Sequence, residues 1–150
     1  NTTLVGFTLI FTGIVLWSTR YIRIHSQSLN SGKSILIGMA QMLAILPGIS
    51  RSGMTISAGL FTGISRKEAA RFSFLLAIPA IAGSMVFTLA DLFTGNVAGP
   101  GIGILLVGMI TAFVIGYLAI KFLLKILESG KFSLFAPYCL IVAALVLIFL

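Results

Sequence analysis

The sequence predicts an all-α integral membrane protein with four transmembrane helices and one re-entrant helical hairpin. Of its 150 residues, 59% are hydrophobic and only 9% are charged, and the mean hydropathy is +1.17. Soluble domains carry about 25% charged residues. The few charges of this chain could not cover so much apolar surface in water. The apolar residues also form segments close to the length that a bilayer crossing needs, about 20 residues.

Four apolar segments are the predicted crossings. They are Leu4–Thr19, Phe72–Ala90, Ile102 to about Ile120 with Leu127 as an alternative end, and Phe132–Leu150. A fifth segment, Ser34–Gly63, is interrupted by Pro47-Gly48. Because Pro lacks the N–H that a helix interior needs and Gly tolerates the following turn, its two halves are each too short to cross. We therefore predict a re-entrant hairpin over about residues 34–63, with its irregular tip buried in protein or lining a wet cavity.

The placement of the basic residues supports this topology. Three precede the hairpin, three follow it, and three lie around the last connection between spans. They are, in that order, Arg20, Arg23 and Lys33; Arg66, Lys67 and Arg71; and Lys121, Lys125 and Lys131. The connection from Asp91 to Gly101 has none. If the hairpin enters and leaves on one side, nine of the ten Lys and Arg residues share that side, which the positive-inside rule identifies as the cytoplasm. This arrangement predicts that both chain ends lie outside, and it argues against nucleic acid as the partner of the +7 net charge.

The remaining composition excludes several kinds of site. Cys139 is the single cysteine and His25 the single histidine, which excludes a disulfide framework and a cysteine- or histidine-cluster metal site. The chain begins at Asn1 in an apolar segment without the pattern of a signal peptide. We expect residues 1–150 to form a single membrane domain of a longer protein.

Arg51, the tenth basic residue, lies at the predicted hairpin tip. An arginine inside a membrane cannot lose its proton and must be paired or solvated, and Arg51 is more than ten residues from either end of its segment. Glu68 fits a capping box with Ser65, and the other two carboxylates lie at span ends. The partner of Arg51 is therefore either an acidic residue outside this chain or an anionic ligand.

The neighbours of Arg51 favour a phosphate-type ligand. Ser50 and Ser52 flank it where a half-helix begins, and Thr55 follows one turn later. A helix start offers unpaired N–H groups and the positive end of a dipole, and a guanidinium binds phosphate oxygens through two parallel hydrogen bonds. Serine is also a common N-cap, so the two serines alone do not establish the site.

Two stretches carry a resemblance to a known family. "PGISRSGMT" (residues 47–55) and "GISRKEAARFSFLLAIPA" (63–80) resemble the second signature region of the undecaprenyl-diphosphate phosphatases, the bacitracin-resistance proteins. The similarity continues through "ITAFVIGYLAIKFLLK" to the C-terminus. It implies a cell-membrane hydrolase that removes the terminal phosphate from undecaprenyl diphosphate and recycles the lipid carrier for peptidoglycan synthesis. It also implies an inverted-repeat fold, of which this chain is the second half.

The resemblance assigns diphosphate binding to Ser50, Arg51 and Thr55, which we also predict to be the catalytic residues of this chain. Gly48 and Ser52 also match the motif and are predicted to bind the diphosphate. The family's acidic motif belongs to an N-terminal half that is absent here. We therefore expect a divalent cation, Mg or Ca, to bind mainly in that half, with no metal site in this chain. Ser50 or Ser52 as nucleophile is the less favoured alternative, because this chain has no base to activate either. We expect the site to open outward.

Other interpretations remain open. A polyprenyl-phosphate flippase or anion transporter would use the same helix-end phosphate site, and a non-catalytic half-protein would assemble with a partner chain. The small residues of Gly59-x-x-x-Gly63 and of Gly108-x-x-x-Ala112-x-x-x-Gly116 predict close helix packing, within the fold or in a homodimer. Gln41 is expected to form an interhelical hydrogen bond. The candidates for walls around the polyprenyl tail are Phe72, Phe74 and the helix from Ile102 to Ile120.

Overall fold

The computed structural model describes residues 2–22, 27–94 and 101–149, and it is helical as expected. The α-helices are α1 (Thr2–Ser18), α2 (Ser31–Leu43), α3 (Arg51–Phe61), α4 (Arg66–Phe93), α5 (Ile102–Glu128) and α6 (Phe135–Phe149). Two short 3-10 helices, η1 (Thr19–Tyr21) and η2 (Phe132–Leu134), follow α1 and precede α6. Within these ranges the β-structure amounts to one isolated bridge between Gln27 and Ile64.

Four helical stretches are long and apolar enough to cross a membrane, as the sequence predicts. They are Thr2–Tyr21, Arg66–Asp91, Ile102–Glu128 and Phe132–Phe149. Two bounds differ from expectation. The helix α4 begins at Arg66 rather than Phe72, because the capping box of Ser65 and Glu68 starts it within the polar stretch. The helix α5 takes the longer of its two expected ends and continues to Glu128. These helices confirm a multi-pass membrane protein.

The fifth segment is broken in the middle, as predicted. The helix α2 ends at Leu43, α3 begins at Arg51, and the backbone between them turns through Gly48 at φ +93°. With 13 and 11 residues, α2 and α3 are about 20 and 17 Å long, well short of a hydrocarbon core of about 30 Å. The helix α2 starts three residues before Ser34, because the Asn30 side chain accepts a hydrogen bond from the Lys33 N–H at 3.0 Å and caps it.

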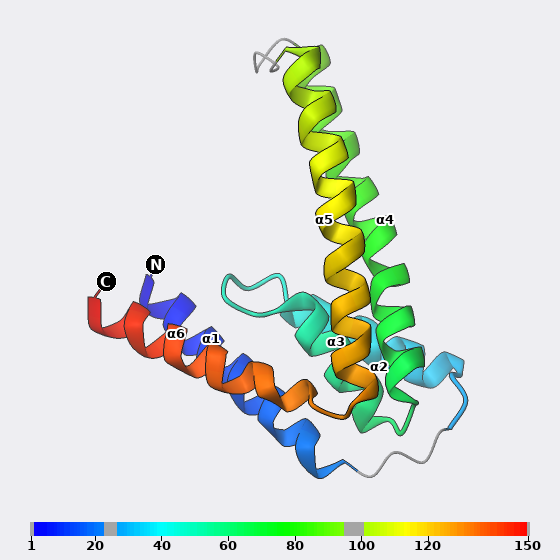
Figure 1. Ribbon diagram of the computed structural model, residues 1–150, viewed down its shortest axis with the longest axis vertical. Helices are drawn as coiled ribbons and strands as arrows, with labels where there is room; N and C mark the ends of the chain where they lie inside the picture. The colour runs from blue at the N-terminus through cyan, green and yellow to red at the C-terminus, as the bar shows by residue number, and fades with distance from the viewer. Residues whose placement is uncertain (1, 23–26, 95–100, 150) are drawn as a thin grey trace.

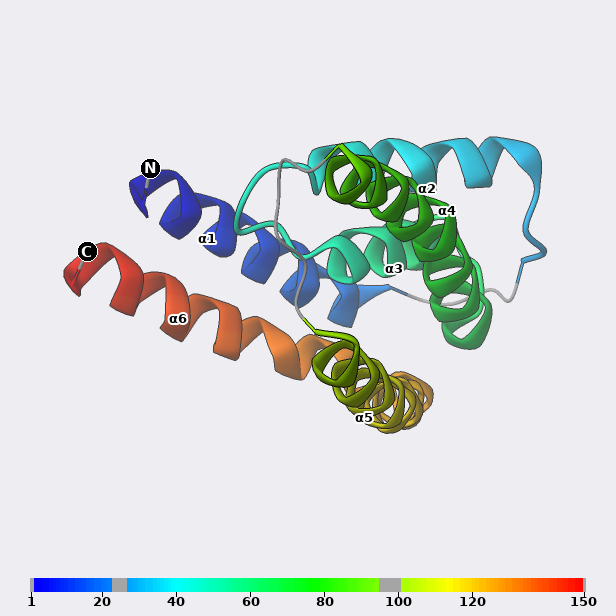
Figure 2. The same ribbon diagram turned by 90° about the horizontal axis from the view of Figure 1, so that it is seen from above.

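The helices form two antiparallel pairs that diverge from a common junction (Figures 1 and 2). The helices α1 and α6 lie side by side with both chain ends at the same end of the pair, while α4 and α5 extend in another direction. The helix α3 packs against α1, α2 and α4, and most of its residues are buried. The fold therefore holds the start of α3 at the point where the pairs meet.

A small apolar core fixes that junction. It includes Leu16 of α1, Ile56 and Leu60 of α3, Leu127 of α5 and Phe132 of η2. Beyond the junction α5 is almost entirely exposed and α4 nearly so. Because these exposed faces are apolar, they suit contact with lipid or with protein outside this chain.

The small-residue motifs have different outcomes. At Gly59 an added Cβ would lie 2.8 Å from the Ala69 Cβ, so this glycine allows the close approach of α3 and α4. Gly63 ends α3 at φ +80° and serves as a turn residue. Gly108 and Gly116 have no neighbouring atom within 4 Å of an added Cβ. Close packing within the fold is therefore confirmed at Gly59 and not found along α5.

The basic residues gather around the junction. The end of α1, the start of α4, the end of α5 and the start of α6 all lie there (Figure 1). These ends carry Arg20, Arg66, Lys125 and Lys131.

Candidate anion-binding site

The start of α3 offers free hydrogen-bond donors. Ser50 is the N-cap, and its Oγ accepts a hydrogen bond from the Gly53 N–H at 3.2 Å. The Ser50 carbonyl accepts the first helical bond, from the Met54 N–H at 2.9 Å. The N–H groups of Arg51 and Ser52 precede any helical partner, and none of the hydrogen bonds in the described part of the chain uses them. Two backbone donors therefore remain available at the positive end of the helix dipole.

Arg51 adds a full positive charge at this same end. A cation at a helix start is unfavourable unless something offsets it. The Nη2 atom of Arg51 is buried and has no hydrogen-bond partner in the described part of the chain. A buried donor without a partner costs about 1–3 kcal/mol, and more when it is charged. An anion bound here would relieve both costs.

The carboxylates of the chain do not supply that anion. Glu68, Asp91 and Glu128 are all exposed. Glu68 is occupied by the predicted capping box, in which its N–H donates to Ser65 Oγ at 3.3 Å and the Ser65 hydroxyl donates to its carboxylate at 3.1 Å. The counter-charge for Arg51 has to come from outside the described residues of this chain.

Threonines of α1 hold the irregular backbone before α3. The Thr8 hydroxyl lies 2.5 Å from the Pro47 carbonyl oxygen. Thr12 Oγ1 lies 3.4 Å from both the Gly48 carbonyl oxygen and the Ser50 nitrogen. These residues were not predicted from the sequence, although two threonines four positions apart on an apolar helix are the available signal. Non-helical backbone at membrane depth needs such partners.

Thr55 lies apart from the other predicted site residues. Gly48, Ser50, Arg51 and Ser52 surround the start of α3, whereas Thr55 is fully buried one turn deeper. Its Oγ1 lies 2.9 Å from the Arg51 carbonyl oxygen and 2.5 Å from Ser73 Oγ of α4. Ser73 was also missed, and its only signal was a polar residue in the apolar part of a predicted span.

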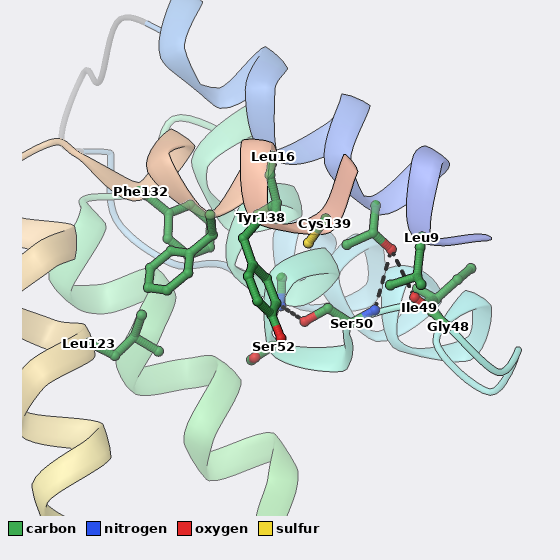
Figure 3. Close-up of a pocket in the computed structure, with 13 residues that line it drawn as sticks. Leu9, Leu16, Gly48, Ile49, Ser50, Ser52, Leu123, Phe132, Tyr138 and Cys139 are labelled. Carbon is green, nitrogen blue, oxygen red and sulfur yellow. Dashed lines mark hydrogen bonds between the residues drawn. The ribbon is translucent and has the colours of Figure 1, made fainter. Parts of the chain in front are cut away.

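Two cavities flank the start of α3. The larger, about 420 Å³, has Thr12, Gly48, Ser50 and Ser52 on its polar side. The rest of its lining is mostly apolar and comes from α1, α5, α6, η2, the connection before α3 and Gly53 of α3: Leu9, Leu16, Ile49, Gly53, Leu123, Phe132, Phe135, Tyr138 and Cys139 (Figure 3). The smaller, about 250 Å³, is lined by Arg51, Ser52, Ser73, Phe74 and Ala77. Of the expected tail-wall residues, Phe74 lines the smaller cavity, whereas neither Phe72 nor a residue of Ile102–Ile120 lines either cavity. Leu123 of α5, beyond that expected range, lines the larger.

The two cavities share Ser52 and together suit an amphipathic ligand. Charge and donors concentrate at Arg51 and the start of α3, and apolar side chains form the far wall of the larger cavity. Tyr138 projects from α6 with its hydroxyl end toward Ser52 (Figure 3). The hydroxyl of Ser52 takes part in no hydrogen bond within the described ranges.

The described residues do not form a site for a divalent cation. No three His, Cys, Asp or Glu side chains within residues 2–22, 27–94 and 101–149 come together as ligands, and the three carboxylates are exposed and dispersed. No carboxylate or imidazole lines either cavity, so neither Ser50 nor Ser52 has a base beside it in this part of the chain. His25 lies outside the described residues. Gln41 Oε1 is buried without a partner among those residues, so the expected interhelical hydrogen bond is not found there.

Comparison with known proteins points to one family. The family model described as "Bacitracin resistance protein BacA" matches residues 1–145. A protein from Desulfosudis oleivorans named undecaprenyl-diphosphatase is 49% identical over 147 residues, which are 96% of this chain and 53% of that protein. Proteins of the same name from Desulfatibacillum aliphaticivorans and Methanothermobacter thermautotrophicus are each 46% identical, over 97% and 91% of this chain. The chain spans 53% of the two bacterial relatives and 78% of the third.

Proposed function

The chain belongs to the bacitracin resistance protein BacA family, and from this membership we propose that it supplies the diphosphate-binding part of a membrane undecaprenyl-diphosphate phosphatase. The observation that carries the proposal is the unpartnered, buried Nη2 of Arg51 at the positive end of α3. The names of relatives that share 46–49% of its residues support the substrate. In the reaction, water hydrolyses the phosphoanhydride bond of the lipid diphosphate, which yields the lipid monophosphate and inorganic phosphate.

Arg51 binds the terminal phosphate in this proposal. Its guanidinium donates two parallel hydrogen bonds to phosphate oxygens, and the N–H groups of Arg51 and Ser52 donate further bonds from the helix start. Ser52 lines both cavities, and its hydroxyl completes the donor set. Phosphoryl transfer is catalysed chiefly by positioning and by offsetting charge on the transferred group, and these groups are suited to both tasks.

The larger cavity receives the lipid next to the headgroup. Its apolar lining of about six large side chains begins where the donors of Ser50 and Ser52 end. A phosphate held by Arg51 would place the first isoprene units of the chain against this lining. The apolar burial contributes binding free energy of about 25 cal/mol per Å² of lipid surface covered, and it excludes water from one side of the headgroup.

The described residues do not supply a general base or a cation site. We propose that both, together with the nucleophile or the water it activates, come from the part of the longer relatives that this chain does not match, the first half of an inverted-repeat fold. What this chain does is bind, orient and neutralise the headgroup.

The membrane topology follows from the same arrangement. We propose that α2 and α3 enter the membrane from the cytoplasmic side and return to it, so that the basic junction faces the cytoplasm. The site then opens outward in the cell membrane, because the hairpin closes the cytoplasmic approach. The proposal includes a homodimer through the exposed α5.

Phosphate release by the purified full-length protein tests the proposal. The protein in lipid nanodiscs should release inorganic phosphate from undecaprenyl diphosphate, and a chelator should reduce the rate if the absent half carries a cation. Movement of a fluorescent polyprenyl phosphate across proteoliposomes without phosphate release would refute the phosphatase and favour a flippase. Absence of both activities would refute each of these functions.

A further inference from the structure

We propose that Ser73 of α4 is a positioning residue of the anion site, which holds Arg51 in place through Thr55. The inference rests on the proposed function, because it concerns the site that binds the diphosphate. It also changes the role expected for Thr55, which becomes a residue that acts on Arg51 rather than one that contacts the ligand.

The evidence begins with the two buried hydroxyls. Thr55 is 0% exposed and Ser73 is 4% exposed, and their oxygens lie 2.5 Å apart across the contact between α3 and α4. Thr55 Oγ1 also lies 2.9 Å from the Arg51 carbonyl oxygen. The chain of contacts therefore runs from the interior of α4, through Thr55, to the backbone of the residue that carries the guanidinium.

The number of protons limits what these hydroxyls can do. Each hydroxyl carries one proton. When Thr55 donates to the Arg51 carbonyl, Ser73 has to donate to Thr55, and neither proton is left for a phosphate oxygen. The burial of Thr55 leads to the same conclusion, since a ligand at the helix start cannot reach a residue with no exposed surface.

Ser73 also lines the smaller cavity, together with Arg51 and Ser52. The hydrogen bond to Thr55 thus fixes the wall of α4 against the first turn of α3 at the place where the guanidinium lies. Without the bond, the first turn of α3 can shift relative to α4, and shifts well below 1 Å weaken a bidentate contact. Loss of either hydroxyl should therefore act on the same step.

A double-mutant cycle in the full-length protein tests this role. The variants are Thr55→Val, Ser73→Ala and their combination, with Thr55→Ser as the variant that keeps the hydroxyl. Ser57→Ala is the matched control, because Ser57 is equally buried on α3 and its Oγ has no partner among the described residues. The readouts are kcat/KM for undecaprenyl diphosphate and the Kd for inorganic pyrophosphate measured by calorimetry.

Each single loss of a hydroxyl should lower kcat/KM and raise Kd about tenfold, and the double variant should be no worse than either single variant. Thr55→Ser should lose much less than Thr55→Val, because it keeps the hydroxyl, and Ser57→Ala should match the wild type. Additive losses of about a hundredfold would overturn the proposal, since they would show that Ser73 and Thr55 contact the ligand independently. Wild-type values of kcat/KM and Kd in the Ser73→Ala variant would overturn it as well. If the variants show the expected pattern in Kd but the protein does not hydrolyse the lipid, only the phosphatase activity is refuted.

Discussion

Replacement of Arg51 by lysine keeps the positive charge at the start of α3 and removes the planar fork. An ammonium retains about one of the two charge-assisted hydrogen bonds that a guanidinium makes to phosphate. The bond that is lost is worth about 1.5–3 kcal/mol, which corresponds to a decrease of roughly 10- to 150-fold in kcat/KM. Arg51→Gln also removes the charge, and we expect its activity to fall by roughly 10²–10⁴-fold.

The stability of these variants should not follow their activity. The Nη2 atom of Arg51 has no hydrogen-bond partner in the described part of the chain, so its removal breaks no bond that the structure records for that atom. Loss of a buried cation at a helix start also removes an unfavourable interaction with the dipole. Arg51→Gln should therefore melt at the wild-type temperature or slightly above it, while its catalytic activity is severely reduced.

The assay is phosphate release from undecaprenyl diphosphate in nanodiscs, together with thermal unfolding of the same preparations. The matched control is Arg71→Lys, the same substitution at an exposed position of α4, which should keep the wild-type rate. Hydrolysis by Arg51→Lys within twofold of the wild type would refute the bidentate role. A large drop in the melting temperature of Arg51→Gln would show that the guanidinium has a structural partner.

Three further predictions concern the surroundings of the site. Gly48→Ala should lower the free energy of unfolding by roughly 2–4 kcal/mol, because φ is +93° and an added Cβ would lie 2.8 Å from the Val5 carbonyl oxygen. Gly38→Ala is the control, because the space around its added Cβ is open, and it should not destabilise the protein. Equal losses of the two variants in chemical denaturation would contradict this prediction. Gly59→Ala should lower the melting temperature more than Gly108→Ala does, since only the former meets a neighbouring helix; the reverse order would place a tighter contact on α5. Cys139, the only cysteine of this chain, lines the larger cavity. Farnesyl diphosphate should therefore slow the labelling of Cys139 by a small maleimide roughly tenfold in the folded protein. Unchanged labelling, measured by mass spectrometry, would exclude the lipid from that cavity.

The comparison of sequence and structure is clearest at Arg51. Its isolation among uncharged residues, the Pro47-Gly48 break and the flanking serines predicted a helix start with an unpaired cation, and the structure has Arg51 as the first residue of α3 with Ser50 as its cap. These features are local, because caps, breaks and turns depend on residues a few positions apart. The capping box of Ser65 and Glu68 was predictable for the same reason.

Contacts between distant segments were not predictable in the same way. The carbonyls at Pro47 and Gly48 accept from α1 hydroxyls more than thirty positions away, and the spacing of Thr8 and Thr12 gives no indication of which backbone they meet. Thr55 follows Arg51 by one helical turn, and the sequence placed it with the ligand. The hydrogen bond between its hydroxyl and Ser73 of α4 was not predictable, because the rotation of a helix about its axis is set by what it packs against.

The sequence by itself determined the membrane class, the helical segments, the break before α3 and the cation at its start, since hydrophobicity, segment length and the properties of Pro, Gly and Arg are carried by neighbouring residues. Only the tertiary structure decided which hydroxyls hold the broken backbone, that Thr55 and Ser73 share a hydrogen bond, and that Ser52 lines two cavities. Apolar helices pack in many orientations at similar free energy, because van der Waals contact between them is not directional. The final arrangement therefore depends on the fit of whole surfaces, which no single segment of the sequence contains.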